Sequence, residues 1–143
     1  MILVDVNLLI YATNTDASQH VAARQWLDEK LAGPPRVGIP WPSVVGFLRI
    51  TTNPRAFARP LTMVTAWKQV EDWLRCETVW TPHPTERHSQ VFANLLGQPG
   101  VQGNLVSDAH LAALAIEHGL TLCSTDGDFA RFRDLKWLDP LAG

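Results

Sequence analysis

Two short apolar runs, each followed closely by an aspartate, constrain what this chain can fold into. Residues 2–4 lead directly into Asp5, and residues 120–123 are followed by Asp126. Continuous, largely apolar runs of this length are typical of strands that are buried on both faces, as in a parallel sheet. Because a carboxylate at the end of a buried strand adds nothing to a core, both aspartates indicate a ligand site at the carboxyl edge of that sheet.

Strands and helices alternate along the rest of the chain. Helical patterns are expected at 18–31, 41–50, 64–74, 84–96 and from about 104–107 to Gly119, and further short strands at 37–39, 77–80 and 135–138. This alternation predicts a three-layer α/β/α sandwich around a mainly parallel central sheet. The glycine- and proline-rich segment 97–103 is the expected flexible loop beside the site. With 143 residues and no internal repeat, residues 1–143 are expected to form one domain.

The composition excludes several classes of protein. The net charge of −2 provides no global basic field for nucleic acid, and the N-terminal apolar run is too short for a signal peptide or a membrane span. The isolated Cys76 and Cys123 form no disulfide framework, which suits a reducing compartment. We therefore expect a cytoplasmic protein that does not use a membrane.

One local stretch is cationic. Arg49, Arg55 and Arg59 lie between residues 44 and 63, where there is no acidic residue. These arginines are candidates for binding RNA phosphates, and the alternative is an ordinary solvated loop and helix end.

A third aspartate is expected to join the first two. If the two runs pair as neighbouring strands, about 4.8 Å apart, Asp5 and Asp126 open into the same crevice. Asp108 begins the helical pattern before the second run, and a right-handed crossover can bring that helix start to the same edge. Like charges this close need a neutralising cation, and hard carboxylate oxygens favour Mg²⁺ or Mn²⁺.

Other polar residues are weaker candidates. Asp128 is a possible further metal ligand, but Asp126-Gly127-Asp128 is also a turn sequence, in which Asp128 is expected to cap the next helix. Asn7 and Thr125 could orient the carboxylates by hydrogen bonds. The histidines lack the i,i+4 spacing of a helical metal clamp and are expected to be ordinary and partly exposed; they are His83, His88, His110 and His118.

Three stretches carry a family resemblance. They are Val-Asp-Val-Asn at 4–7, Ser-Asp-Ala-His-Leu-Ala-Ala-Leu-Ala at 107–115, and Ser-Thr-Asp-Gly-Asp-Phe at 124–129. With the element order, they resemble the PIN-domain nucleases, and among these the toxins of VapBC toxin–antitoxin systems. The resemblance implies a metal-dependent endoribonuclease that cleaves tRNA or rRNA, is usually a homodimer, and is held inactive by an antitoxin protein.

The chain departs from the family at one position. The family usually has a glutamate just before an apolar-apolar-Arg run, and here Gly46 precedes Phe47-Leu48-Arg49. The departure puts a two-metal site in doubt, and Asp128 could supply part of the lost charge.

The sequence therefore predicts that Asp5, Asp108 and Asp126 hold a cation that activates a water and neutralises charge on the attacked phosphate. One alternative is a binding module that keeps the fold but has lost catalysis. Another is an Asp-based phosphoryl-transfer protein such as a receiver or a dehalogenase-like phosphatase. That class needs a second acid where Val6 or Asn7 stands and a suitably placed lysine, which the sequence does not clearly offer.

Overall fold

The computed structural model describes residues 1–142. The elements are β1 (Ile2–Val4), α1 (Val6–Thr13), α2 (His20–Ala32), β2 (Val37–Gly38), α3 (Trp41–Thr51), α4 (Met63–Leu74), β3 (Val79–Trp80), α5 (His88–Leu96), α6 (Leu105–His118), β4 (Thr121–Cys123), the 3₁₀ turn η1 (Gly127–Arg131) and β5 (Lys136–Leu138). Within these residues the strands pair in the order β3-β2-β1-β4-β5, and every pairing is parallel. No helix in the described part of the chain is long and apolar enough to cross a membrane.

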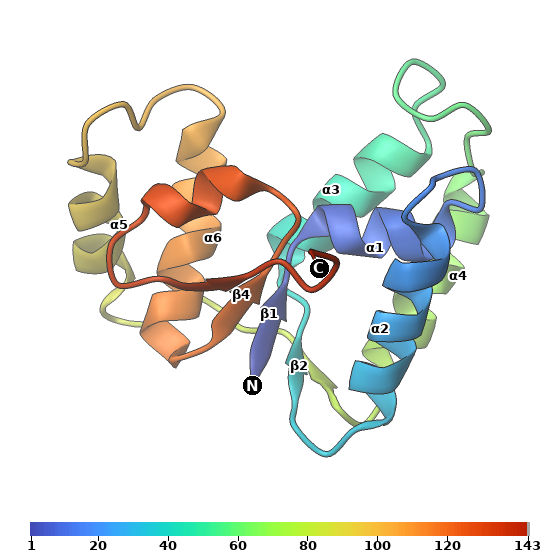
Figure 1. Ribbon diagram of the computed structural model, residues 1–143, viewed down its shortest axis with the longest axis horizontal. Coiled ribbons are helices and arrows are strands. Elements are labelled where there is room, and N and C mark those ends of the chain that lie inside the picture. Colours follow the sequence, from blue (N-terminus) through green and yellow to red (C-terminus); the bar gives the residue numbers. More distant parts are fainter. Residues whose placement is uncertain (143) are drawn as a thin grey trace.

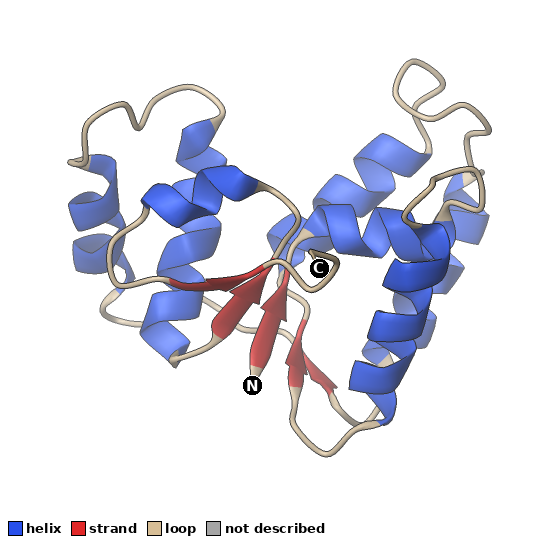
Figure 2. Ribbon diagram, in the orientation of Figure 1, coloured by secondary structure: helices blue, strands red, loops and turns tan. Residues whose placement is uncertain are grey.

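Helices cover both faces of the sheet, which confirms the expected three-layer class (Figures 1 and 2). Helices α1 to α4 lie on one side, and α5, α6 and η1 lie on the other. Successive strand residues point to opposite faces, so Leu3 and Leu122 pack in the core on the α6 side. Val4 and Cys123 pack in the second core, against α1 and α3. The strands are therefore buried on both faces, as their apolar runs predict.

The pairing of β1 with β4 aligns the ends of two distant segments. Leu3 is in register with Leu122, and Val4 with Cys123. The ladder continues past β1, since the Asp5 amide donates to the Cys123 carbonyl at 3.0 Å. Asp5 and the segment after Cys123 therefore leave the sheet at the same edge, and the predicted neighbouring strands are confirmed.

Helix α6 brings Asp108 to that edge. The helix ends at Gly119, whose φ of 66° lets the Leu120 amide turn back to the Ala115 carbonyl at 2.8 Å. Its central residues are buried on almost every side, with alanines at 109, 112, 113 and 115 that let the sheet, α5 and η1 approach closely. The first turn, which includes Asp108, projects beyond this packing.

Helix α1 was not expected from the sequence. Residues 6–13 are almost continuously apolar, so their pattern does not distinguish a helix from an extension of the first strand. Asp5 decides the outcome by capping the helix, because its Oδ1 accepts from the Val6 amide at 2.8 Å. The helix then buries Leu8 and Leu9 against the sheet.

A buried polar network holds α5 to α6. The Glu117 side chain has an exposed fraction of 0% and accepts hydrogen bonds from the Thr85 amide (2.8 Å), the Thr85 hydroxyl (2.7 Å) and His88 Nδ1. His88 Nε2 in turn lies 3.1 Å from His110 Nδ1. His88 is partly exposed, as expected, but it is held by Glu117 and His110. The Thr85 amide and hydroxyl both donate to Glu117, and α5 begins after this residue, at His88 and not near residue 84 as expected.

Glu117→Gln should lower the free energy of unfolding at pH 7 by about 2 kcal/mol, the usual scale for buried hydrogen bonds to a charged group. Burial acts to raise the pKa of Glu117, but the Thr85 and His88 hydrogen bonds outweigh it and the pKa is lowered. The stabilisation is therefore fully present above the ordinary value of 4.5 and is lost as the pH falls through the lowered folded value.

Urea denaturation of both proteins across this pH range measures the effect, with the exposed Glu86→Gln as the matched control. The difference between wild type and Glu117→Gln should shrink in acid. A difference that is independent of pH would show that the carboxylate charge is not the stabilising feature.

Candidate metal centre

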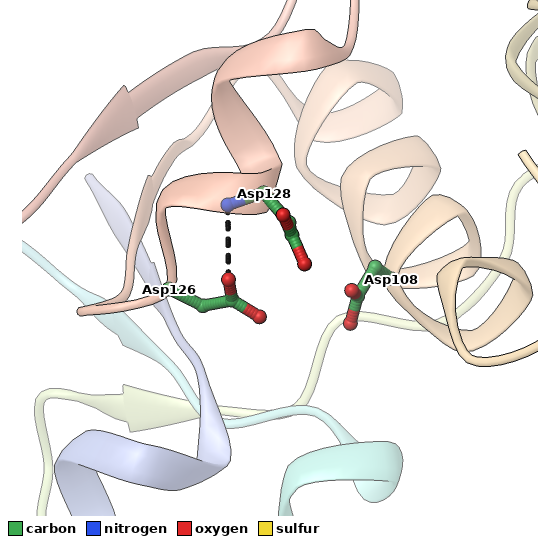
Figure 3. Close-up of side chains that lie close together, drawn as sticks. All are labelled: Asp108, Asp126 and Asp128. Carbon is green, nitrogen blue, oxygen red and sulfur yellow. Dashed lines mark hydrogen bonds between the residues drawn. The ribbon is translucent and has the colours of Figure 1, made fainter. Parts of the chain in front are cut away.

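Three carboxylates converge at the carboxyl edge of the sheet (Figure 3). Asp108 comes from the first turn of α6, and Asp126 and Asp128 come from the segment after β4. One oxygen from each lies within 4.8 Å of the others. The cap of η1 is Asp126, whose Oδ1 accepts from the Asp128 amide at 2.9 Å, so the expectation that Asp128 is the cap was wrong. The Asp128 carboxylate is consequently free to face Asp108.

Asp5 lies beside this cluster and is committed to hydrogen bonds. Only 9% of the residue is exposed. Its Oδ2 accepts from the Ser124 hydroxyl at 2.7 Å and from Asn7 Nδ2 at 3.3 Å, in addition to the Oδ1 contact that caps α1. Burial raises the pKa of Asp5, opposed by the Ser124 and Val6 hydrogen bonds and reinforced by the charge of Asp126, and the net direction is upward.

Ser124 is a site residue that the sequence interpretation missed. Its fully buried hydroxyl donates to Asp5, accepts from the Asp126 amide at 3.0 Å and accepts from Asn7 Nδ2 at 3.0 Å. Thr125 takes part through its backbone, whose amide donates to Asn7 Oδ1 at 3.4 Å. Ser124 stands in the motif at 124–129, and its place directly after a buried strand was the available signal.

The cluster is electrostatically strained without a cation. Burial raises the pKa of Asp108 to about 6, with further contributions from Asp126, Asp5 and Asp128, while Arg131 acts in the opposite direction. Hard oxygen donors, held close together from two elements, match the preference of Mg²⁺ or Mn²⁺, which would remove this repulsion. The residues present therefore fit such an ion.

A cavity of about 340 Å³ opens beside the cluster, between α3 and α6. Its wall includes Asp5, Asp108, Gly46 and Arg49. A polymer phosphate in this cavity would meet the carboxylates on one side and the Arg49 cation on the other. The cavity can therefore accept a phosphate group next to a bound cation.

The other two candidate arginines lie elsewhere. Arg59 forms an exposed ion pair with Asp16, with Nη2 2.6 Å from Oδ1. Arg55 is exposed in the turn that follows α3, where its amide donates to the Asn53 side chain. Of the three candidates, Arg49 is the one that lines the cavity shared with Asp5 and Asp108.

Gly46 faces the same cavity, next to the start of α1. A Cβ atom at this position would lie 3.1 Å from Val6 Cγ2 and 3.5 Å from Val6 Cβ. Val6 is β-branched and sits in the first turn of a helix, so it has few alternative rotamers. A side chain at position 46 therefore requires Val6 to shift by a few tenths of an ångström.

The chain is similar to known proteins over nearly its whole length. The family described as PIN domain matches residues 2–135. Ribonuclease VapC37 of Mycobacterium tuberculosis is 43% identical over 142 residues, 99% of each chain. FitAcB from Neisseria gonorrhoeae superposes with a TM-score of 0.70 at 19% identity, covering 98% of each chain. A toxin–antitoxin complex from Klebsiella pneumoniae gives 0.62 at 19% identity, again over 98% of each chain. The two solved structures show a likeness of fold.

Asp108→Asn should raise the melting temperature of the metal-free protein at pH 7. The raised pKa means that the folded state binds a proton more tightly than the unfolded state, so wild type should lose stability as the pH rises from 3.8 to about 6. The variant has no carboxylate that titrates at this position, so its melting temperature should change less with pH. Calorimetric melting in EDTA measures both effects, with the exposed Asp134→Asn as the control. A lower melting temperature for Asp108→Asn would identify a structural role for this carboxylate.

Gly46→Glu should destabilise the protein, although glutamate is a better helix former than glycine by up to about 1 kcal/mol. The clash with Val6 is the reason, so the same substitution in a Val6→Ala background should recover stability. Melting temperatures of both single variants and of the double variant form a cycle that isolates this contact. Additive effects of the two substitutions would show that Val6 is not what excludes a side chain at position 46.

Proposed function

Since the chain belongs to the PIN-domain family, we propose that it is the endoribonuclease toxin of a toxin–antitoxin pair and cuts RNA with a bound Mg²⁺ or Mn²⁺ ion. The resemblance in the sequence is confirmed by the full-length relative named as a ribonuclease. One observation carries the chemical part of the proposal. The convergence of Asp108, Asp126 and Asp128 beside an open cavity provides both a cation site and room for a phosphate.

The cluster residues have distinct roles in this proposal. Asp108, Asp126 and Asp128 hold the cation, and the largely buried Asp5, which lines the cavity with Asp108, adds charge beside them. A divalent ion, when bound there, supplies Lewis-acid chemistry that activates water and neutralises phosphate charge. Asp5 is kept in one orientation by Ser124 and Asn7, so its contribution does not depend on a flexible side chain.

Arg49 receives the substrate. Its place in the wall shared with Asp108 allows the guanidinium to bind a phosphate oxygen of the RNA while the scissile group faces the carboxylates. The exposed position of Arg49 on α3 keeps this contact accessible from solvent. This arrangement orients the chain of phosphates without selecting a base sequence.

The partner is an antitoxin protein. The similarity of fold to a toxin–antitoxin complex and the ribonuclease relative both support this. The acidic cluster offers a contact for such a partner, since an arginine or lysine could pair with the carboxylates in place of the cation. We further propose that the protein works in the cytoplasm as a homodimer.

The remaining alternative is a binding module without catalysis. Gly46 supports it, because the acid that the family usually has at this place is absent. Asp128 argues against it, because this side chain adds a third carboxylate to the cluster from another element. The family match over residues 2–135 argues against the other alternative, an Asp-based phosphoryl-transfer protein.

Calorimetric titration with Mn²⁺ and cleavage of a single-stranded RNA test the proposal together. Wild type should bind Mn²⁺ saturably and cut RNA only when the ion is present. Asp108→Asn and Asp126→Asn should each weaken metal binding at least tenfold, or about 1.4 kcal/mol, and abolish cleavage. Asp134→Asn, which changes an exposed carboxylate, should do neither. Metal binding without cleavage by wild type would favour the binding module instead.

A further inference from the structure

Arg131 is a cation at the opposite side of the carboxylate cluster from Arg49. It is the last residue of η1, and its Nη2 lies 3.9 Å from Asp128 Oδ1. Among the described residues, Arg131 is the cation whose charge acts on Asp108. The sequence patterns did not single out Arg131, and the phosphate contact proposed for Arg49 gives Arg131 no role.

The side chain of Arg131 reaches from η1 to the loop at residues 97–103. At Gly100, where φ is 81°, a Cβ atom would lie 3.4 Å from Arg131 Nη1. The glycine therefore leaves the guanidinium room beside the loop backbone. The Arg131 side chain is 40% exposed, which leaves N–H donors of the guanidinium open to solvent.

The ion pair with Asp128 does not fix Arg131 in place. The two side chains are 40% and 56% exposed, and their 3.9 Å separation is too long for a hydrogen bond. Exposed pairs of this kind contribute little to stability. A ligand that offers a fully charged oxygen with better geometry can therefore replace Asp128 as the partner of the guanidinium.

We propose that Arg131 is a positioning residue that binds an RNA phosphate adjacent to the scissile one, on the η1 side of the carboxylates. This inference rests on the proposed ribonuclease function. Arg49 and Arg131 then hold the RNA backbone on both sides of Asp108, with Arg49 on the α3 wall and Arg131 on the η1 wall. Two cationic contacts that flank an acidic centre let a polyanion cross a surface that would otherwise repel it.

Binding of a short fluorescent single-stranded RNA, measured by anisotropy in EDTA at several KCl concentrations, tests this role without cleavage. Arg131→Gln should weaken RNA binding about tenfold and reduce the slope of log affinity against log salt by about 0.7, the value for one phosphate contact on a single strand. Arg131→Lys keeps the charge and should restore most of the slope.

The matched control is Arg75→Gln. Arg75 forms an exposed ion pair with Glu71 at the end of α4, and it precedes β3, so it lies at the opposite edge of the sheet from the carboxylates. This control removes the same charge and should leave the slope unchanged. Melting temperatures of the two variants should match. In Mn²⁺, Arg131→Gln should raise the KM for RNA cleavage with little change in kcat.

Four outcomes would count against the inference. Equal RNA affinities and slopes for Arg131→Gln and Arg75→Gln would show that Arg131 does not contact the RNA. Weaker Mn²⁺ binding by Arg131→Gln would show that Arg131 shapes the carboxylate cluster instead. If wild type neither binds nor cuts RNA, the proposed function itself fails, whereas cleavage that is unaffected by Arg131→Gln removes only this contact.

Discussion

The pairing of β1 with β4 is the constraint on which the site depends. This pairing joins residues that are more than a hundred positions apart. It sets Val4 opposite Cys123, so the segments that follow the two strands leave the sheet at the same edge. The buried hydroxyl of Ser124 then links the two segments, because it donates a hydrogen bond to the Asp5 carboxylate and accepts one from the Asp126 amide. Because these bonds form inside the protein, losing one would leave a buried polar group unpaired.

The same arrangement stores electrostatic repulsion. Asp108 is supplied by α6, a helix packed so closely on its other sides that it cannot move away from the carboxylates after β4. The pKa of Asp108 rises to about 6 as a result of burial and of its acidic neighbours. These carboxylates therefore repel one another in the metal-free fold, and a bound cation would relieve that repulsion.

Gly46 and Asp128 lie on different elements beside the same carboxylates. Helix α3 provides no acid at position 46, where a Cβ atom would lie 3.1 Å from Val6 Cγ2. Asp128 brings a carboxylate from η1 instead, and it can do so because Asp126 takes over the cap of that turn. We propose that Asp128 thereby supplies part of the charge that a glutamate at position 46 would bring.

The sequence by itself determined the parallel α/β/α class, the end of α6 at Gly119 and the place of Asp5 and Asp126 at the carboxyl edge. Each follows from local rules, since apolar runs predict buried strands and glycine ends a helix with positive φ. Only the tertiary structure decided that residues 6–13 form a helix, that Asp128 joins Asp108, that Ser124 and Glu117 have partners far along the chain, and that Arg131 lies beside Gly100. These depend on which oxygen or amide lies within about 3 Å after packing, and residue spacing does not encode such distances.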